Sequence, residues 1–203
     1  MSLTHAVIIA GGEGQRLGGV RKADLRIGGV RQIDRVVAAL GPVARPILVS
    51  TGPEHRRIDL PADCSALPDL DARHGGPLAG LAAAVGRLAR EGITHGLLAS
   101  VAVDTPFLPT DFVQRLETAL GQATTAFAAW GDDFYPPNAI WRVGSLQGLP
   151  ASIIDGTAPN SLKALQRQLG AVRVDWSESD KANPFLNINT VADLVALQRI
   201  ARG

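Results

Sequence analysis

The sequence predicts one α/β domain with an open, mostly parallel sheet that helices cover on both faces. Three observations support this class. Strand-like and helical patterns alternate along the chain, the strand-like runs are apolar throughout, and 203 residues suit a single domain. Hydrophobic residues make up 46% of the chain, which is enough for a large core. We therefore expect a three-layer α/β/α domain over residues 1–203, without a dividing linker.

The first half of the chain supplies the clearest elements. Strands are expected over Ala6–Ala10, Pro46–Ser50, Ala66–Asp69 and Gly96–Val103, and helices over Gln32–Leu40 and from Pro77 to about Arg90. The first strand is a β-branched apolar run that Gly11 ends. The first helix has apolar residues at helical spacing, and Gly41-Pro42 ends it. Proline suits the first turn of the second helix.

The second half predicts a looser series of elements. Strands are expected over Thr124–Trp130, Asn138–Val143 and Val172–Trp176, and helices over Thr110–Leu120, Ser145–Asp155, Asn160–Leu169 and from Asn189/Thr190 to about Ala201. Thr110 is the expected cap of its helix. Thr190 and Asp193 have the spacing of a capping box at the start of the last helix.

Composition excludes several classes of protein. A net charge of +1 leaves no broad basic field for nucleic acid or a membrane surface, and aromatic residues at 4% argue against base stacking. The single cysteine, Cys64, excludes an internal disulfide and a cysteine zinc site. We expect no signal peptide and no membrane span, because no apolar run approaches about 20 residues. A reducing cytoplasm fits these features.

The most informative segment runs from Gly11 to Lys22. A buried strand ends in a loop with five glycines, Arg16 and Lys22, so bare backbone N–H groups and two cations would meet a bound phosphate. The alternative is a glycine-rich turn without a ligand, which would cost backbone entropy and leave the two cations without a purpose. The segment is not a P-loop, because Ala23 follows Lys22, and it is not a dinucleotide fingerprint, because Leu17 replaces the third glycine.

Polar residues follow several of the other expected strands, where open parallel sheets bind ligands. Asp104 directly follows the most apolar strand, and its carboxylate would suit Mg²⁺ beside substrate phosphates. The sequence Asp104-Thr-Pro is equally typical of a turn, so Asp104 could instead serve only to form that turn. Asp69 and Asp71 end a shorter strand, and solvated loop acids are the simpler interpretation there.

Two further segments could approach a ligand. Gly75-Gly76-Pro77-Leu-Ala-Gly80 brings glycines to a helix start, which suits either an anion or tight packing of helix on sheet. Asn187-Ile-Asn189 precedes the last helix, so one asparagine can cap it while the other holds a ligand or a metal-bound water.

Four motifs occur in the same order as in a known family. Ile9-Ala-Gly-Gly12-x-Gly14-x-Arg16-Leu-Gly-Gly19-x-x-Lys22 resembles the opening signature of the MobA-like nucleotidyltransferases. The other three motifs are Gly76-Pro77-Leu-Ala-Gly80, Asp104-Thr-Pro-Phe-Leu-Pro109 and Phe185-Leu-Asn187-Ile-Asn189-Thr190. The resemblance extends from about Ala6 to Leu197. It implies a Rossmann-like fold of the nucleotide-diphospho-sugar transferase type.

Gly11-Gly12 and the Asp104 motif resemble the guanylyltransferase branch, which joins GMP from GTP to molybdopterin and releases pyrophosphate. The resemblance implies a nucleotide-binding half over about 1–110 and an acceptor half over about 111–203. It also implies Mg²⁺ as cofactor and transient contact with cofactor-handling proteins. Oligomeric state stays open.

The resemblance implies a role for each matched residue. Arg16 and Lys22 would hold the triphosphate, and Asp104 would bind Mg²⁺ and nucleotide. The other implied ligand-binding residues are Ile9, Ala10, Gly11, Gly12, Ser50, Asp69, Gly76, Pro77, Gly80, Asn187 and Asn189.

The chain departs from the family at several positions. Arg21, Val103 and Tyr135 replace a common aspartate, cysteine and histidine, Ser50 replaces a common asparagine, and Thr157–Leu162 lacks a frequent arginine. Two of these departures, Tyr135 and Thr157–Leu162, fall in the acceptor half. Cytidylyl or other nucleotidyl transfer to molybdopterin or to a sugar or polyol phosphate therefore remains an alternative, as does a nucleotide-binding regulatory module without catalysis.

Overall fold

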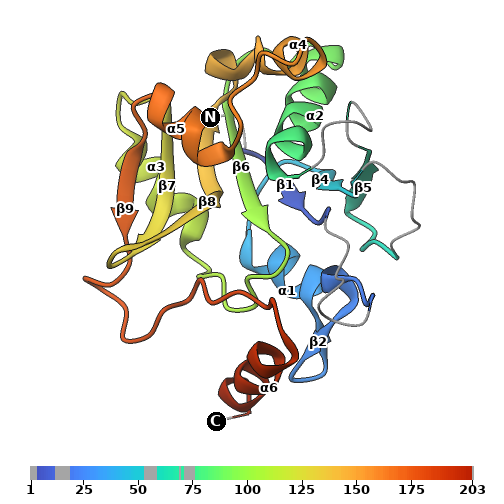
Figure 1. Ribbon diagram of the computed structural model, residues 1–203, viewed down its shortest axis with the longest axis vertical. Helices are drawn as coiled ribbons and strands as arrows, with labels where there is room; N and C mark the ends of the chain where they lie inside the picture. The colour runs from blue at the N-terminus through green and yellow to red at the C-terminus, as the bar shows by residue number, and fades with distance from the viewer. Residues whose placement is uncertain (1–3, 12–18, 53–58, 69, 71–75, 203) are drawn as a thin grey trace.

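A seven-stranded sheet runs through the middle of the molecule, with helices on both faces and a small two-stranded sheet at one end (Figure 1). The structure is a computed structural model that describes residues 4–11, 19–52, 59–68, 70 and 76–202. The main sheet contains β1 (His5–Ile9), β4 (Ile47–Ser50), β5 (Cys64–Leu67), β6 (Leu97–Ala102), β7 (Thr125–Trp130), β8 (Asp133–Arg142) and β9 (Val172–Asp175). The predicted α/β class with a mostly parallel sheet is confirmed.

The helices alternate with these strands along the chain. They are α1 (Gln32–Ala39), α2 (Pro77–Arg90), α3 (Phe112–Leu120), α4 (Leu149–Ile154), α5 (Leu162–Gln168) and α6 (Val191–Ile200), with short 3₁₀ helices η2 (Lys22–Asp24) and η3 (Val143–Leu146). No helix in the described part of the chain is long and apolar enough to span a membrane.

The strand order is β5-β4-β1-β6-β8-β7-β9. The pairings of β1, β4, β5 and β6 are parallel, and β7 pairs with β9 in parallel. Only β8 runs against its neighbours β6 and β7. Because Ile9 pairs with both Ser50 and Ala102, the carboxyl ends of the three central strands lie at one edge of the sheet.

Each face of the sheet has its own apolar core. Alternate residues of the strands point to opposite faces, so Ile8 contributes to the layer under α1 and α3, whereas Val7 and Ile9 contribute to the layer under α2, α4 and α5. α2 buries most of its residues, including Leu81 and Val85 at 0% exposure. Burial of one such side chain stabilises the fold by about 1.5–3 kcal/mol, which explains why this alanine-rich helix is fixed against the sheet.

The small sheet pairs β2 (Arg26–Ile27) with β3 (Val30–Arg31). Gly28 and Gly29 connect the two strands with φ of 56° and 82°, a turn that favours glycine. A third apolar cluster of Ile27, Ile188 and Leu197 joins this hairpin to α6. Figure 1 shows α6 and β2 together at the lower end of the molecule. This contact brings the last motif of the sequence back to the segment that contains Lys22.

Three predicted boundaries were wrong. Thr110 does not cap α3, because the Phe112 N–H bonds to the Pro109 carbonyl in a turn and the helix begins one residue after Asp111. The expected helix over 145–155 is divided into η3 and the shorter α4, which begins beyond Gly148. β8 begins at Asp133 rather than Asn138, because the chain crosses a register shift there instead of starting a new strand.

Candidate active site

The ends of β1 and β6 form the floor of the site. The Ala10 N–H donates to the Ser50 carbonyl at 3.0 Å, and the Val103 N–H donates to the Ile9 carbonyl at 3.1 Å. These bonds continue the sheet one residue past the strands. As a result Gly11 and Asp104 leave the same edge side by side, as predicted from the parallel strand order.

Lys22, Asp104 and Asn189 converge at this edge from three distant segments. The Lys22 ammonium donates to Asp104 Oδ2 at 2.6 Å and to Asn189 Oδ1 at 2.8 Å. The side chains of Lys22 and Asp104 are 22% and 14% exposed, so the ion pair is partly shielded from water and still open on one side. All three residues were predicted from the sequence, and the structure places them together.

A capping box fixes Asn189 beside Lys22. The Thr190 hydroxyl accepts the Asp193 N–H at 3.1 Å, and Asp193 Oδ2 accepts the N–H groups of Asn189 and Thr190 at 2.9 and 2.8 Å. The backbone bonds from Asn189 and Thr190 lower the pKa of the Asp193 carboxyl below its usual range. The predicted capping box is therefore confirmed, and it also holds the backbone of a site residue. The expectation that an asparagine caps this helix was wrong, because the Thr190 hydroxyl accepts the Asp193 N–H and makes Thr190 the cap.

The segment before this box is anchored to Asp104 itself. The Ile188 N–H donates to the Asp104 carbonyl at 3.3 Å, while the Ile188 side chain is fully buried in the cluster with the hairpin. Asn187 and Asn189 flank Ile188, so burial of its side chain holds both amides at the edge of the sheet.

A cavity of about 230 Å³ opens at this edge. Seven of its ten lining residues belong to the predicted set: Ile9, Ala10, Gly11, Lys22, Pro77, Asp104 and Asn187. Ala102, Val103 and Pro137 complete the wall. The cavity therefore joins the first, second, third and fourth motifs in one place.

Ser50 and Gly80 lie below the cavity rather than in its wall. Ser50 is 1% exposed, and a Cβ added to Gly80 would lie 2.5 Å from its Oγ. Glycine at position 80 therefore permits close packing of α2 on β4 and β1. This is the tight packing of helix on sheet that was one of the two alternatives for this segment. Gly76 stands at the N-cap of α2 with φ of 96°, exposed and next to Pro77. A ligand role for Ser50, Gly76 or Gly80 stays a prediction.

Asn138, a buried residue that supports the site through hydrogen bonds, was not predicted from the sequence. It follows Pro136-Pro137, which have no N–H groups, at the register shift of β8. Its Oδ1 accepts the Ala102 N–H at 2.8 Å, and its Nδ2 donates to Thr105 Oγ1 at 3.4 Å. Asn138 is 1% exposed, so it holds both sides of Asp104 from within the core. The Pro-Pro-Asn sequence was the available signal.

Three predicted site residues, Gly12, Arg16 and Asp69, lie outside the described residues.

Tyr135, which stands where the family commonly has a histidine, lies beside the fourth motif. Its hydroxyl accepts a hydrogen bond from Asn183 Nδ2 at 2.7 Å, and burial raises the pKa of Tyr135. Tyr135 contacts Phe185 at 5.1 Å between ring centroids, so its ring joins the core beside the fourth motif.

The donor set at this edge fits a hard cation. The Asp104 carboxylate already accepts a hydrogen bond from the Lys22 ammonium, and Asn187 and Asn189 bring amide oxygens or N–H groups to the same edge. No group of three or more His, Cys, Asp or Glu within the described ranges could hold a metal. One carboxylate with amide oxygens suits Mg²⁺, which keeps waters and substrate phosphates as its other ligands, and does not suit zinc.

Comparisons with known proteins identify relatives of this chain. A family model for the MobA-like NTP transferase domain matches residues 6–172. The chain is 36% identical to the molybdenum cofactor guanylyltransferase of Acidiphilium cryptum over 96% of this chain and 93% of the relative. It is 33% identical to the protein of that name from Cereibacter sphaeroides over 97% and 96% of the two chains.

Solved structures agree with the fold. Molybdopterin-guanine dinucleotide biosynthesis protein A from Archaeoglobus fulgidus superimposes with a TM-score of 0.74 at 20% identity, covering 98% of this chain and 99% of that one. 2-C-methyl-D-erythritol 4-phosphate cytidylyltransferase from Thermus thermophilus superimposes with a TM-score of 0.66 at 19% identity over both full chains. The match to the family model and the full-length similarity to curated relatives show that the chain belongs to the MobA-like NTP transferase family.

Proposed function

We propose that this protein transfers GMP from GTP to molybdopterin and releases pyrophosphate. The observation that carries the proposal is the convergence of Lys22, Asp104 and Asn189 at the mouth of the Ile9–Gly11 cavity. A cation, a carboxylate and an amide beside an exposed strand end suit a triphosphate with its metal. Relatives that cover the whole chain are named for this activity.

The reaction is a substitution at phosphorus. A terminal phosphate oxygen of the acceptor attacks the α-phosphorus of GTP, a new P–O bond forms, and the bond to the β-phosphate oxygen breaks with its electrons. A phosphate monoester is largely ionised near neutral pH, so the nucleophile needs no strong general base. Catalysis then depends on positioning and on stabilisation of charge.

Each residue of the site has a part in that reaction. Lys22 offsets the charge that grows on the α-phosphate, and Asp104 with Asn189 holds its ammonium at the cavity until the nucleotide enters. Gly11 exposes backbone to the nucleotide, and Arg16 holds the leaving pyrophosphate. Asn187 faces the acceptor or a metal-bound water from the cavity wall.

Mg²⁺ would be held by Asp104 and would supply charge neutralisation on the phosphate oxygens. The guanine preference rests on Gly11-Gly12 and on the names of the relatives. We place the reaction in the cytoplasm, which suits a chain whose single cysteine is unpaired.

The test is a pyrophosphate-release assay with molybdopterin and GTP, CTP, UTP or ATP, each titrated with Mg²⁺. We expect release with GTP, and loss of most of the rate in Lys22→Ala. Asp104→Asn should shift the Mg²⁺ requirement to higher concentration. A preference for CTP would replace guanylyl by cytidylyl transfer. Binding of GTP without release in the presence of molybdopterin would make the protein a regulatory module. An unchanged Mg²⁺ titration in Asp104→Asn would remove the metal site.

A further inference from the structure

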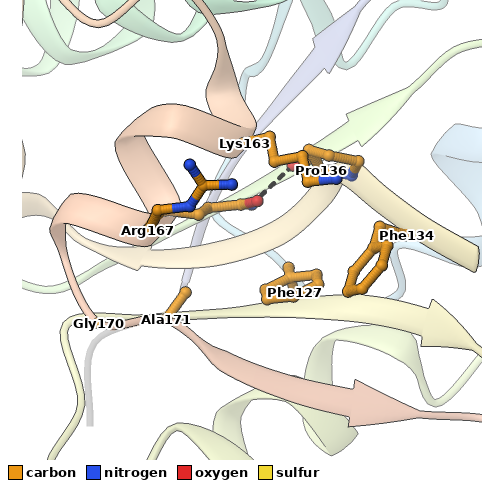
Figure 2. Close-up of a pocket in the computed structure, with 8 residues that line it drawn as sticks. Phe127, Phe134, Pro136, Lys163, Arg167, Gly170 and Ala171 are labelled. Atoms are coloured by element: carbon orange, nitrogen blue, oxygen red, sulfur yellow. Dashed lines mark hydrogen bonds between the residues drawn. The ribbon is translucent and has the colours of Figure 1, made fainter. Parts of the chain in front are cut away.

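A second and larger cavity lies on the α5 face of the sheet. Its volume is about 390 Å³, within the range of small-molecule sites. Phe127 of β7 and Phe134 of β8 border it on the side of the sheet, and Lys163 and Arg167 border it from α5. Figure 2 shows the two phenyl rings and the Arg167 guanidinium around the same hollow.

This cavity, which we call the Phe134 cavity, contains an unusually exposed aromatic side chain. Phe134 is 46% exposed, although its ring is only 6.0 Å from that of Phe127. The Lys163 ammonium stands 4.8 Å from the centre of the Phe134 ring. The Arg173 guanidinium lies 5.8 Å from the same centre. A half-exposed ring beside cations can stack with another flat, electron-rich group.

Two cations at the cavity are not paired with a carboxylate. Lys163 and Arg167 have no ion pair within the described part of the chain, whereas Arg87 and Arg115 each have one. A third cation nearby, Arg173, is paired with Asp175 at 2.9 Å. In a chain with a net charge of +1, Lys163 and Arg167 therefore give this ligand-sized hollow a positive border.

The Phe134 cavity adjoins the active-site cavity through one peptide of β8. Pro136 lines the Phe134 cavity and Pro137 lines the active-site cavity. The Gln166 amide, which is 3% exposed, donates to the Pro136 carbonyl at 2.9 Å (Figure 2). This bond fixes α5, and the two cations it carries, to the wall between the cavities.

We propose that the Phe134 cavity binds the flat heterocycle of the acceptor, which stacks on Phe134 with its carbonyl and anionic groups toward Lys163 and Arg167. The inference rests on the proposed function, because that function supplies a flat acceptor whose phosphate must reach the neighbouring cavity. A nucleotide base would also stack here, but GTP already has its phosphates at Lys22. The Phe134 cavity therefore sets acceptor specificity rather than nucleotide specificity.

The test measures acceptor and nucleotide separately. The Michaelis constants for molybdopterin and for GTP are measured in Phe134→Ala, in Phe134→Tyr and in the double variant Lys163→Gln/Arg167→Gln. Binding of 6-hydroxymethylpterin is measured calorimetrically in the same proteins without nucleotide. Arg90→Gln, an exposed cation at the far end of α2, is the matched control, and urea unfolding checks that each variant is folded.

We expect Phe134→Ala and the double variant to raise the molybdopterin KM at least tenfold, equivalent to about 1.4 kcal/mol. The GTP KM should change less than twofold, and Phe134→Tyr and Arg90→Gln should resemble the wild type. The pterin should bind the wild type, Phe134→Tyr and Arg90→Gln, and should not bind Phe134→Ala or the double variant.

Two results would overturn the inference. One is an unchanged molybdopterin KM in folded Phe134→Ala and in the double variant while the wild type turns over. The other is a raised GTP KM with an unchanged acceptor KM, which would make the cavity a nucleotide site. If the wild type releases no pyrophosphate with molybdopterin, the proposed function fails. In that case the calorimetric comparison still decides whether the cavity binds a pterin.

Discussion

Gly80→Ala is expected to destabilise the protein although alanine is the better helix former. The added Cβ would lie 2.5 Å from Ser50 Oγ, 2.9 Å from Ser50 Cβ and 3.2 Å from Ile9 Cδ1. A hydroxyl can rotate, but the Ser50 Cβ is fixed to a central strand, so α2 must move. Overpacking of a core costs about 1–3 kcal/mol, and a contact with a fixed atom favours the upper half of that range.

The same substitution gains about 1 kcal/mol of helix propensity. The net loss in the free energy of unfolding is therefore about 1–2 kcal/mol. Gly86→Ala on the same helix is the matched control, since its nearest neighbour, Leu70 Cδ2, is 3.6 Å away. It should gain about 0.5–1 kcal/mol from helix propensity and from a less flexible unfolded chain.

Urea unfolding followed by circular dichroism at 25 °C measures both variants against the wild type. We expect the free energy of unfolding to fall in Gly80→Ala and to rise in Gly86→Ala. A Gly80→Ala protein as stable as Gly86→Ala would show that α2 does not pack on Ser50 as closely as described. Because Pro77 begins the same helix and lines the active-site cavity, Gly80→Ala should also raise the KM for GTP.

Three further predictions concern the site and its supports. Lys22→Met should lower the rate of pyrophosphate release about 100-fold or more, by loss of electrostatic stabilisation. It should change the free energy of unfolding by about 1 kcal/mol or less; a large loss of stability in urea with normal turnover would reverse its assigned role. Asn138→Leu should cost about 1–3 kcal/mol in urea unfolding, because it leaves the partly buried Ala102 N–H without its acceptor. An unchanged unfolding midpoint would contradict this. The Asp193 pKa is lowered in the folded protein, so its carboxylate contributes stability above the ordinary pKa of about 3.9 and loses that contribution as the pH falls below it. The stability difference between the wild type and Asp193→Ala should therefore be present at pH 7 and shrink as the pH falls below about 4. A difference that does not shrink with falling pH would exclude the charge as its source.

The core of the fold follows from local sequence patterns. β1 and β6 are continuous apolar runs that a glycine or an aspartate ends, and such runs predict buried parallel strands. Parallel order then predicts that Gly11 and Asp104 share one edge. The capping box at Thr190 and Asp193 was also predictable, since it depends only on residues three apart.

The missed features depend on contacts between distant residues. The β2–β3 hairpin consists of two-residue strands, and the Gly28-Gly29 pair between Ile27 and Val30 was its only local signal. The direction of β8 is set by its pairing with β6 and β7 rather than by its own sequence. Pro136-Pro137 argues locally against a strand, but the side chain of Asn138 accepts the Ala102 N–H beyond the last paired residues of β6 and β8.

The contact between Lys22 and Asn189 joins residues 167 apart in sequence. Each residue matched a family motif, but their separation along the chain carries no local pattern. Their meeting depends on Ile188, whose side chain packs with Ile27 of the hairpin that the sequence did not predict. The residues of the site and the edge of the sheet where they lie could therefore be predicted from the sequence. The contacts between their side chains could not.

Transfer of a nucleotidyl group can be followed by the position of a radioactive label. The protein is incubated with molybdopterin and Mg²⁺, and with GTP labelled at either the α- or the γ-phosphate. We expect the α-label in the pterin product and the γ-label in pyrophosphate, and we expect Lys22→Met to lower both rates about 100-fold or more. A γ-label on the pterin, or release of both labels as free phosphates and GMP, would contradict this expectation.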